Sequence, residues 1–166
     1  MFIEQLDAVL RRDLNCLKRQ LEHYPDEKAI WRTAPGITNS AGTLALHMVG
    51  NLRHFIGAQF GATGYVRDRD AEFNRRDVPR AELLALVDQA ITDLERALPN
   101  VDSEVLESDY PLKIANATLV TADFLMHLAA HLTYHLGQVD YHRRFVTGQA
   151  GKVNAVSPLE LTTARM

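Results

Sequence analysis

The chain has 166 residues, of which 46% are hydrophobic and 23% charged, a composition typical of a single-domain soluble globular protein. Its formal net charge of −3 provides no general attraction to phosphate backbones or anionic lipid, so neither nucleic acid nor a membrane is an expected partner. Charged residues interrupt the apolar ones in residues 1–16, which argues against a secretion signal and favours a cytoplasmic protein. The single cysteine, Cys16, can form neither an internal disulfide nor a zinc site alone, and we expect it to be buried.

Amphipathic helices are predicted in four stretches of the chain. In residues 3–23, apolar side chains recur at spacings of three and four, which is the pattern of a helix with one buried face. The same pattern follows Asn39 or Ser40, either of which can cap a second helix, and it returns after Pro79, which suits the first turn of a third.

The fourth predicted helix is the longest. It begins near Thr118 or Thr121, continues to about Val146 and stops at Gly148. Since no second strand signal accompanies the four helices, the expected fold is all-α, an antiparallel four-helix bundle.

The segments between the helices are predicted to be irregular. Prolines and a glycine in residues 24–39 predict a long connection. Residues 61–78 contain two glycines and then many charges of both signs, which predicts a solvated loop. We expect one domain over residues 1–150. Residues 151–166 then form a tail that is either packed on the bundle or frayed from it.

The fourth helix carries a stripe of histidines. The stretch "DFLMHLAAHLTYHLGQVDYHRR" holds four of the chain's seven histidines, namely His127, His131, His135 and His142. At about 100° per residue all four lie on one narrow face, beside a sector of leucines. In a helix of a bundle, such a polar stripe can face the interior or a cleft, where unpaired imidazoles are expensive unless something satisfies them.

Helical rise decides which histidines can share a metal ion. His127 and His135 lie roughly 12 Å apart along the axis, too far for bonds of about 2 Å, so only neighbouring pairs chelate and His131 belongs to either pair. On the second helix, His47 and His54 are separated by about 10 Å, so one of them at most joins the site.

Two imidazoles from one helix and a third from its neighbour would give a divalent metal three neutral ligands and leave coordination positions open. That arrangement is typical of catalytic rather than structural sites. Zinc, nickel and iron all accept imidazole, so the ligands do not choose among them. Asp123 and Gln138 are placed to orient ring N–H groups.

The segment "HLTYHLGQV" resembles the H-x-x-x-H-x-G-Q signature of the DinB-like superfamily, bacterial four-helix bundles with a three-histidine metal site. The segment "NSAGTLALHMVGNLRHFIG" is similar to the motif on the second helix of that superfamily. The resemblance implies that His47, His131 and His135 are the metal ligands. Trp31 and the segment "VRDRDAEF" look like features of an uncharacterised subgroup.

The other candidate residues receive smaller roles. His54 and His127 are left outside the ligand set, with His127 expected to be a satisfied, half-buried side chain. His142 is expected to be a surface residue at the helix end, favoured by the local dipole. Gly137 is expected to permit close helix approach, and Gln138 to make an interior hydrogen bond.

Two functions remain open. The resemblance implies a metal-dependent enzyme that activates water or a low-molecular-weight thiol such as bacillithiol or mycothiol, with thiol transfer favoured over hydrolysis. The alternative is a non-catalytic, stress-associated protein that binds a metal or a ligand, because no general base is evident: Asp123 is about two turns from the midpoint of the histidine pair, and Tyr134 faces the same stripe. The resemblance also implies a homodimer.

Overall fold

The chain is all-helical in this computed structural model, which describes residues 1–151, 153 and 156–161. Over those residues the prediction of an all-α fold is confirmed, because extended backbone pairs only in isolated β-bridges. The helical segments are α1 (Phe2–Glu22), η1 (Glu27–Trp31), α2 (Ala41–Leu52), η2 (Arg53–Ala58), α3 (Gln59–Gly61), α4 (Arg69–Asn74), α5 (Arg80–Ala97), η3 (Leu98–Asn100), α6 (Ser103–Glu107), α7 (Thr121–Thr147) and η4 (Pro158–Glu160).

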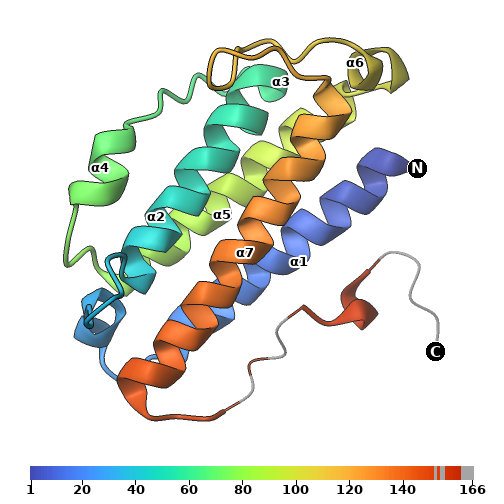
Figure 1. Cartoon of the computed structure of the whole chain (residues 1–166). Coiled ribbons are helices and arrows are strands. Elements are labelled where there is room, and N and C mark those ends of the chain that lie inside the picture. The colour runs from blue at the N-terminus through green and yellow to red at the C-terminus, as the bar shows by residue number, and fades with distance from the viewer. Residues whose placement is uncertain (152, 154–155, 162–166) are drawn as a thin grey trace.

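Four long helical segments lie alongside one another (Figure 1). They are α1, the continuous run α2–η2–α3, α5 and α7. Helix α7 packs against α1 and α2, and α5 packs against the same two helices. No helix in the described part of the chain has the length and apolar character needed to cross a membrane.

Local signals in the sequence place the helix ends. The Ser40 hydroxyl accepts a hydrogen bond from the Thr43 amide at 3.1 Å, which satisfies one of the free N–H groups at the start of α2. Gly148 ends α7 with φ 68°, in the left-handed region that a residue with a side chain adopts only with strain.

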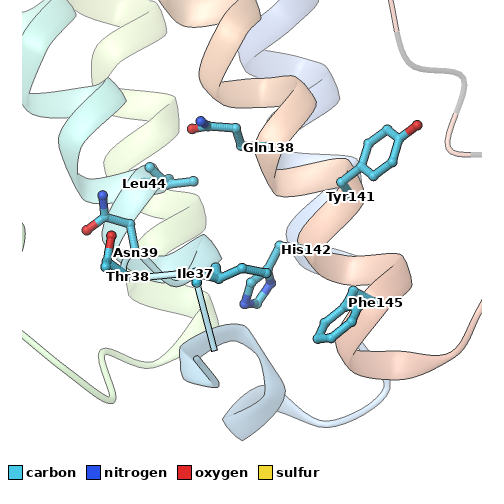
Figure 2. A pocket seen from close by; sticks show the side chains of 9 residues that line it. Ile37, Thr38, Asn39, Leu44, Gln138, Tyr141, His142 and Phe145 are labelled. Carbon is cyan, nitrogen blue, oxygen red and sulfur yellow. The ribbon is translucent and has the colours of Figure 1, made fainter. Parts of the chain in front are cut away.

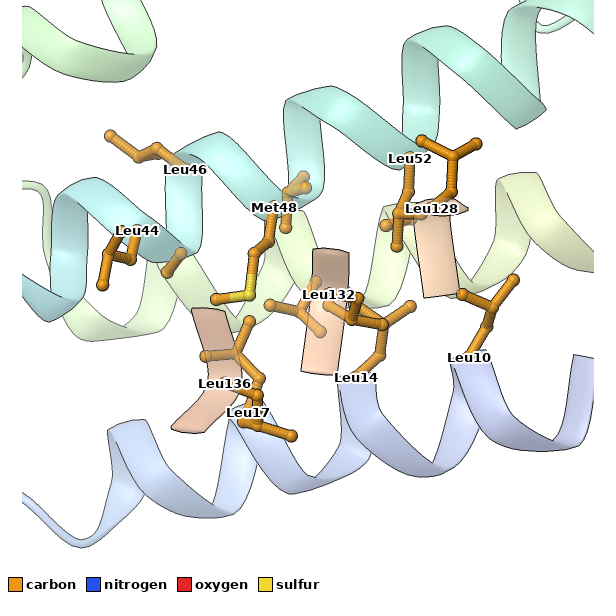
Figure 3. Packing of buried hydrophobic residues seen from close by; sticks show 14 of the residues in the cluster. Leu10, Leu14, Leu17, Leu44, Leu46, Met48, Leu52, Leu128, Leu132 and Leu136 are labelled. Carbon is orange, nitrogen blue, oxygen red and sulfur yellow. The ribbon is translucent and has the colours of Figure 1, made fainter. Parts of the chain in front are cut away.

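A leucine-rich core holds the long helices together. Figure 3 shows the leucines of α7 meeting side chains from α1 and α2. The buried side chains in this contact include Leu10, Leu14, Leu17, Met48, Leu52, Leu128, Leu132 and Leu136. Full burial of one such side chain is worth about 1.5–3 kcal/mol, so the leucine stripe of α7 is held firmly against the core. His131 and His135 therefore lie along the edge of that contact, next to His47 of α2.

The charged segment after α3 is not the solvated loop that the sequence suggests. Within it, α4 packs against α2, and Glu72 is only 5% exposed. The Glu72 carboxylate is tolerated there because Arg67 binds both of its oxygens, at 2.7 and 2.8 Å. The sequence does not reveal the pair of Arg67 and Glu72, because nothing in a run of mixed charge shows which acidic side chain will be buried.

The end of α7 differs from expectation in the same way. His142 is 3% exposed rather than a surface residue: its Nε2 donates to the Arg32 carbonyl, and its Nδ1 accepts from the Tyr24 hydroxyl, both at 2.7 Å. The sequence could not show that η1 and the connection after it would cover this turn of α7. Gly137 also differs, because it is exposed and no described atom lies close enough to explain a glycine by helix packing.

The described residues of the C-terminal tail contact α1 and α7. Arg143, buried on α7, donates to the Gly151 carbonyl at 2.9 Å. Arg19 on α1 donates to the Val153 carbonyl at 3.3 Å and pairs with Glu160 at 3.2 Å. Cys16 is fully buried, as its residue type predicts.

Candidate metal centre

Three histidines from two helices meet in one place. His47 comes from α2, while His131 and His135 lie one turn apart on α7. The Nε2 atom of His131 is 3.0 Å from Nε2 of His135 and 3.4 Å from Nε2 of His47. One ligand atom from each ring lies within 4.8 Å of the others. The structure thus brings together the three residues that the resemblance names.

The tautomers of two rings show that this cluster suits a cation. The Nδ1 atom of His47 is 3.0 Å from Oε2 of Glu72, and Nδ1 of His135 is 2.7 Å from Oε1 of Gln138. Because both oxygens accept hydrogen bonds, each Nδ1 carries the proton and each Nε2 is left with a lone pair. Lone pairs directed at one point repel unless a positive charge lies between them. Tetrahedral bonds of about 2.0–2.1 Å would separate two nitrogens by about 3.3 Å, close to the spacing seen here.

Glu72 and Arg67 support His47 from outside the cluster. Arg67 fixes the Glu72 carboxylate through two hydrogen bonds, and the carboxylate in turn fixes the ring of His47. Burial opposes ionisation of Glu72, but the hydrogen bonds from Arg67 and His47 outweigh it, so the pKa of Glu72 lies below its ordinary value. A carboxylate behind a ligating histidine holds the ring in position and makes it a better donor.

Gly50 makes the contact between α4 and α2 possible. A Cβ atom built at this position would overlap the Glu72 carboxylate. Sequence reasoning missed Glu72 and Arg67, although both lie in the segment "VRDRDAEF". The usable signal was a glycine in the interior of a helix, three residues after a candidate ligand, since such a glycine indicates that another group approaches closely.

Gln138 supports His135 from the solvent side. The predicted hydrogen bond of Gln138 exists, but it is exposed rather than interior. Together, Gln138 and Glu72 fix the orientation of two rings from opposite sides of the cluster. Asp123 and Tyr134, the two side chains considered for acid–base roles, are both exposed on α7.

Burial favours the neutral form of two of the three rings, those of His131 and His135. Burial is the main cause that lowers the pKa of His131 to about 4, and His135, His47, His127 and Arg67 add to it. Burial also lowers the pKa of His135, and the Gln138 hydrogen bond opposes this only in part. Neutral imidazole is the form that binds a metal, so no proton has to leave these rings near neutral pH.

Two further histidines lie near the cluster without joining it. His127 is exposed rather than half-buried, and its ring stacks on that of His131 with centroids 5.9 Å apart. His54 is half-buried beside Phe55, and burial together with the charge of Arg67 lowers its pKa.

A Gly50→Ala variant tests the support of His47. The added methyl group displaces the Glu72 carboxylate, so we expect zinc affinity, measured by competition with a chromogenic chelator, to fall about 10- to 100-fold. Gly137→Ala is the matched control, because it makes the same change inside α7 where no described atom is close. Equal zinc affinity in the two variants would contradict the assigned role of Glu72.

The depressed pKa of His131 predicts a pH dependence of stability in metal-free protein. The pKa of His131 is near its ordinary value of 6.5 in the unfolded chain and about 4 in the folded protein. Its contribution to the free energy of unfolding is therefore complete above about pH 6.5 and is lost as the pH falls towards 4. In urea titrations with chelator present, His131→Gln should lose less stability than the parent chain between pH 7 and 5. Identical losses would show that His131 is not the residue responsible.

Comparison with known proteins identifies a family. The family model described as "Protein of unknown function (DUF1572)" matches residues 1–158. No curated protein and no solved structure matches the chain. Because the match spans far more than half of the sequence, the chain belongs to the DUF1572 family.

Proposed function

We propose that this protein is a metal-dependent enzyme with the four-helix-bundle fold of the DinB-like superfamily. His47, His131 and His135 would hold one divalent ion, namely zinc, nickel or iron. The observation that carries the proposal is the cluster of three ring nitrogens, with two rings held by Glu72 and Gln138 so that Nε2 is free. A donor set whose rings are fixed by hydrogen bonds from outside the cluster is typical of a built site.

Three protein ligands leave coordination positions for an exchangeable molecule. A metal bound there would lower the pKa of a water or thiol ligand and so supply a nucleophile near neutral pH. The chain's own contribution is to favour the neutral form of His131 and His135 and to orient the rings of His47 and His135. We favour a low-molecular-weight thiol over water because of the resemblance to the DinB-like superfamily, which includes thiol-dependent transferases. We also propose a cytoplasmic location, where such thiols are abundant.

The metal content of protein purified without a histidine tag tests the site. We expect about one ion per chain in the parent protein, loss of that ion in His131→Ala, and no change in His127→Ala. The control removes a neighbouring histidine of α7 that stacks on His131 but lies outside the ligand group. Metal retained at the parent level in His131→Ala would refute the assignment.

The same proteins then separate catalysis from binding. Each is incubated with the electrophile monochlorobimane, alone and with bacillithiol or mycothiol, and thioether formation is followed by fluorescence. Turnover by the parent that disappears in His131→Ala supports thiol transfer. A loaded protein without turnover for either thiol favours the non-catalytic alternative.

A second observation supports the alternative function, that of a non-catalytic binding protein that forms a homodimer. Four large apolar side chains of α7 are exposed and lie within about 100° of one another around the helix. They are Met126, Tyr134, Tyr141 and Phe145. Exposed apolar surface on one helix is typical of an association site, and we propose that a second copy covers the part around Met126 and Tyr134.

Light scattering tests the dimer. The parent protein should have twice the chain mass of 18.6 kDa, and a double variant, Met126→Lys with Tyr134→Lys, should have the mass of one chain. Val66→Lys is the control, because it replaces an equally apolar side chain that is 86% exposed in the loop before α4. A parent of single-chain mass would rule the dimer out.

A further inference from the structure

A pocket lies beside the metal centre, in the groove between α2 and α7. Its volume is about 350 Å³, within the range of about 300–1,000 Å³ that is usual for small-molecule sites. Figure 2 shows its walls: α7 on one side, and the turn before α2 together with Leu44 on the other. The lining residues are Gly36, Ile37, Thr38, Asn39, Leu44, Gln138, Tyr141, His142 and Phe145.

Gln138 joins this pocket to the metal centre. Its Oε1 accepts the hydrogen bond from His135, which leaves the amide NH₂ group of the same side chain as a donor. Among the described residues, the structure shows no hydrogen bond from that NH₂ group. Leu44 lies three residues before His47 on α2, so the pocket occupies the neighbouring turn of the groove that holds the three histidines.

The walls of the pocket carry no charge. Its lining contains no acidic residue, lysine or arginine. His142 is neutral, because Nε2 donates to the Arg32 carbonyl while Nδ1 accepts from the Tyr24 hydroxyl, and burial lowers its pKa. A charged ligand would lose hydration here without gaining a partner. Ile37, Leu44 and Phe145 instead offer apolar surface.

We infer that this pocket binds an uncharged molecule with an apolar body and a carbonyl or hydroxyl oxygen. The apolar body packs against Ile37, Leu44 and Phe145, and the oxygen accepts a hydrogen bond from the Gln138 amide. As a binding site, the pocket stands without the metal. Its further role as the place where the electrophilic substrate sits, with its reacting end towards the histidines, rests on the proposed function.

Three probes with the same ring and different charge test the ligand class: benzamide, benzoate and benzylammonium. Each is titrated into ¹⁵N-labelled protein, and binding is followed through the amide signals of Gly36 and the Gln138 side chain. Benzamide should shift both signals in a saturable manner, with an affinity at least tenfold above that of either charged probe. Equal affinity for the three, or shifts confined to other residues, would overturn the inference.

Matched substitutions locate the binding. Ile37→Trp fills the pocket and should weaken benzamide binding at least tenfold, whereas Ile114→Trp should leave it unchanged. Both residues are half-buried isoleucines in an isolated β-bridge, but Ile114 does not line the pocket. Phe145→Ala removes an exposed wall without touching the core, so it should weaken binding even if Ile37→Trp folds poorly. Unchanged affinity in a folded Ile37→Trp or in Phe145→Ala would refute the pocket.

Repeating the titration on chelator-treated and zinc-treated protein separates the two proposals. Benzamide bound at the pocket of a protein that takes up no stoichiometric zinc, nickel or iron would refute the metal site and leave the pocket standing. Stoichiometric zinc with no benzamide binding would refute the pocket alone.

Discussion

Burial of the leucine stripe on α7 is the constraint on which the site depends. Leu128, Leu132 and Leu136 are each about 1% exposed, and their packing fixes how the helix is rotated about its own axis. Residues on the neighbouring sector of the helix must then lie along the groove with α2. His131 and His135 therefore face α2 because of hydrophobic packing elsewhere on the helix, and the clustered ring nitrogens follow from it.

Packing alone would not hold the rings in position, and polar contacts from less regular parts of the chain complete the arrangement. The helix α4 brings Glu72 to His47, and the gap at Gly50 lets it approach. At the other end of the groove, η1 and the connection to α2 cover His142, whose two ring nitrogens are both hydrogen-bonded. The long helices thus supply the ligands, while the short segments supply the groups that orient them or close the groove.

The periodicity of the sequence was enough to predict the elements that depend on repeated local patterns. It predicted the long helices, a cap at Asn39 or Ser40, of which the structure uses Ser40, and the Gly148 stop, because these depend on spacing and on single-residue backbone preferences. Helical rise limited the ligand choices without deciding between His47 and His54 or between the two pairs on α7, and only the family resemblance did so. Neither periodicity nor the family resemblance predicted the contacts between segments that are distant in the sequence. Glu72 reads as one charge in a charged run, and nothing near His142 shows that residues from η1 will cover it.

The ion pair between Glu72 and Arg67, beside His47, also affects the net charge around the histidine cluster. Glu72 contributes one negative charge and Arg67 cancels it, while the lowered pKa values of His131 and His135 favour the neutral form of these two rings near pH 7. A site that binds a divalent ion through carboxylates neutralises part of the ion's charge at once. A divalent ion held here by imidazoles alone would keep both of its positive charges, in surroundings partly shielded from water. Such an ion would favour an anionic partner, such as a hydroxide or a thiolate, at its open positions, and Arg67 would contribute to that preference by cancelling the charge of Glu72.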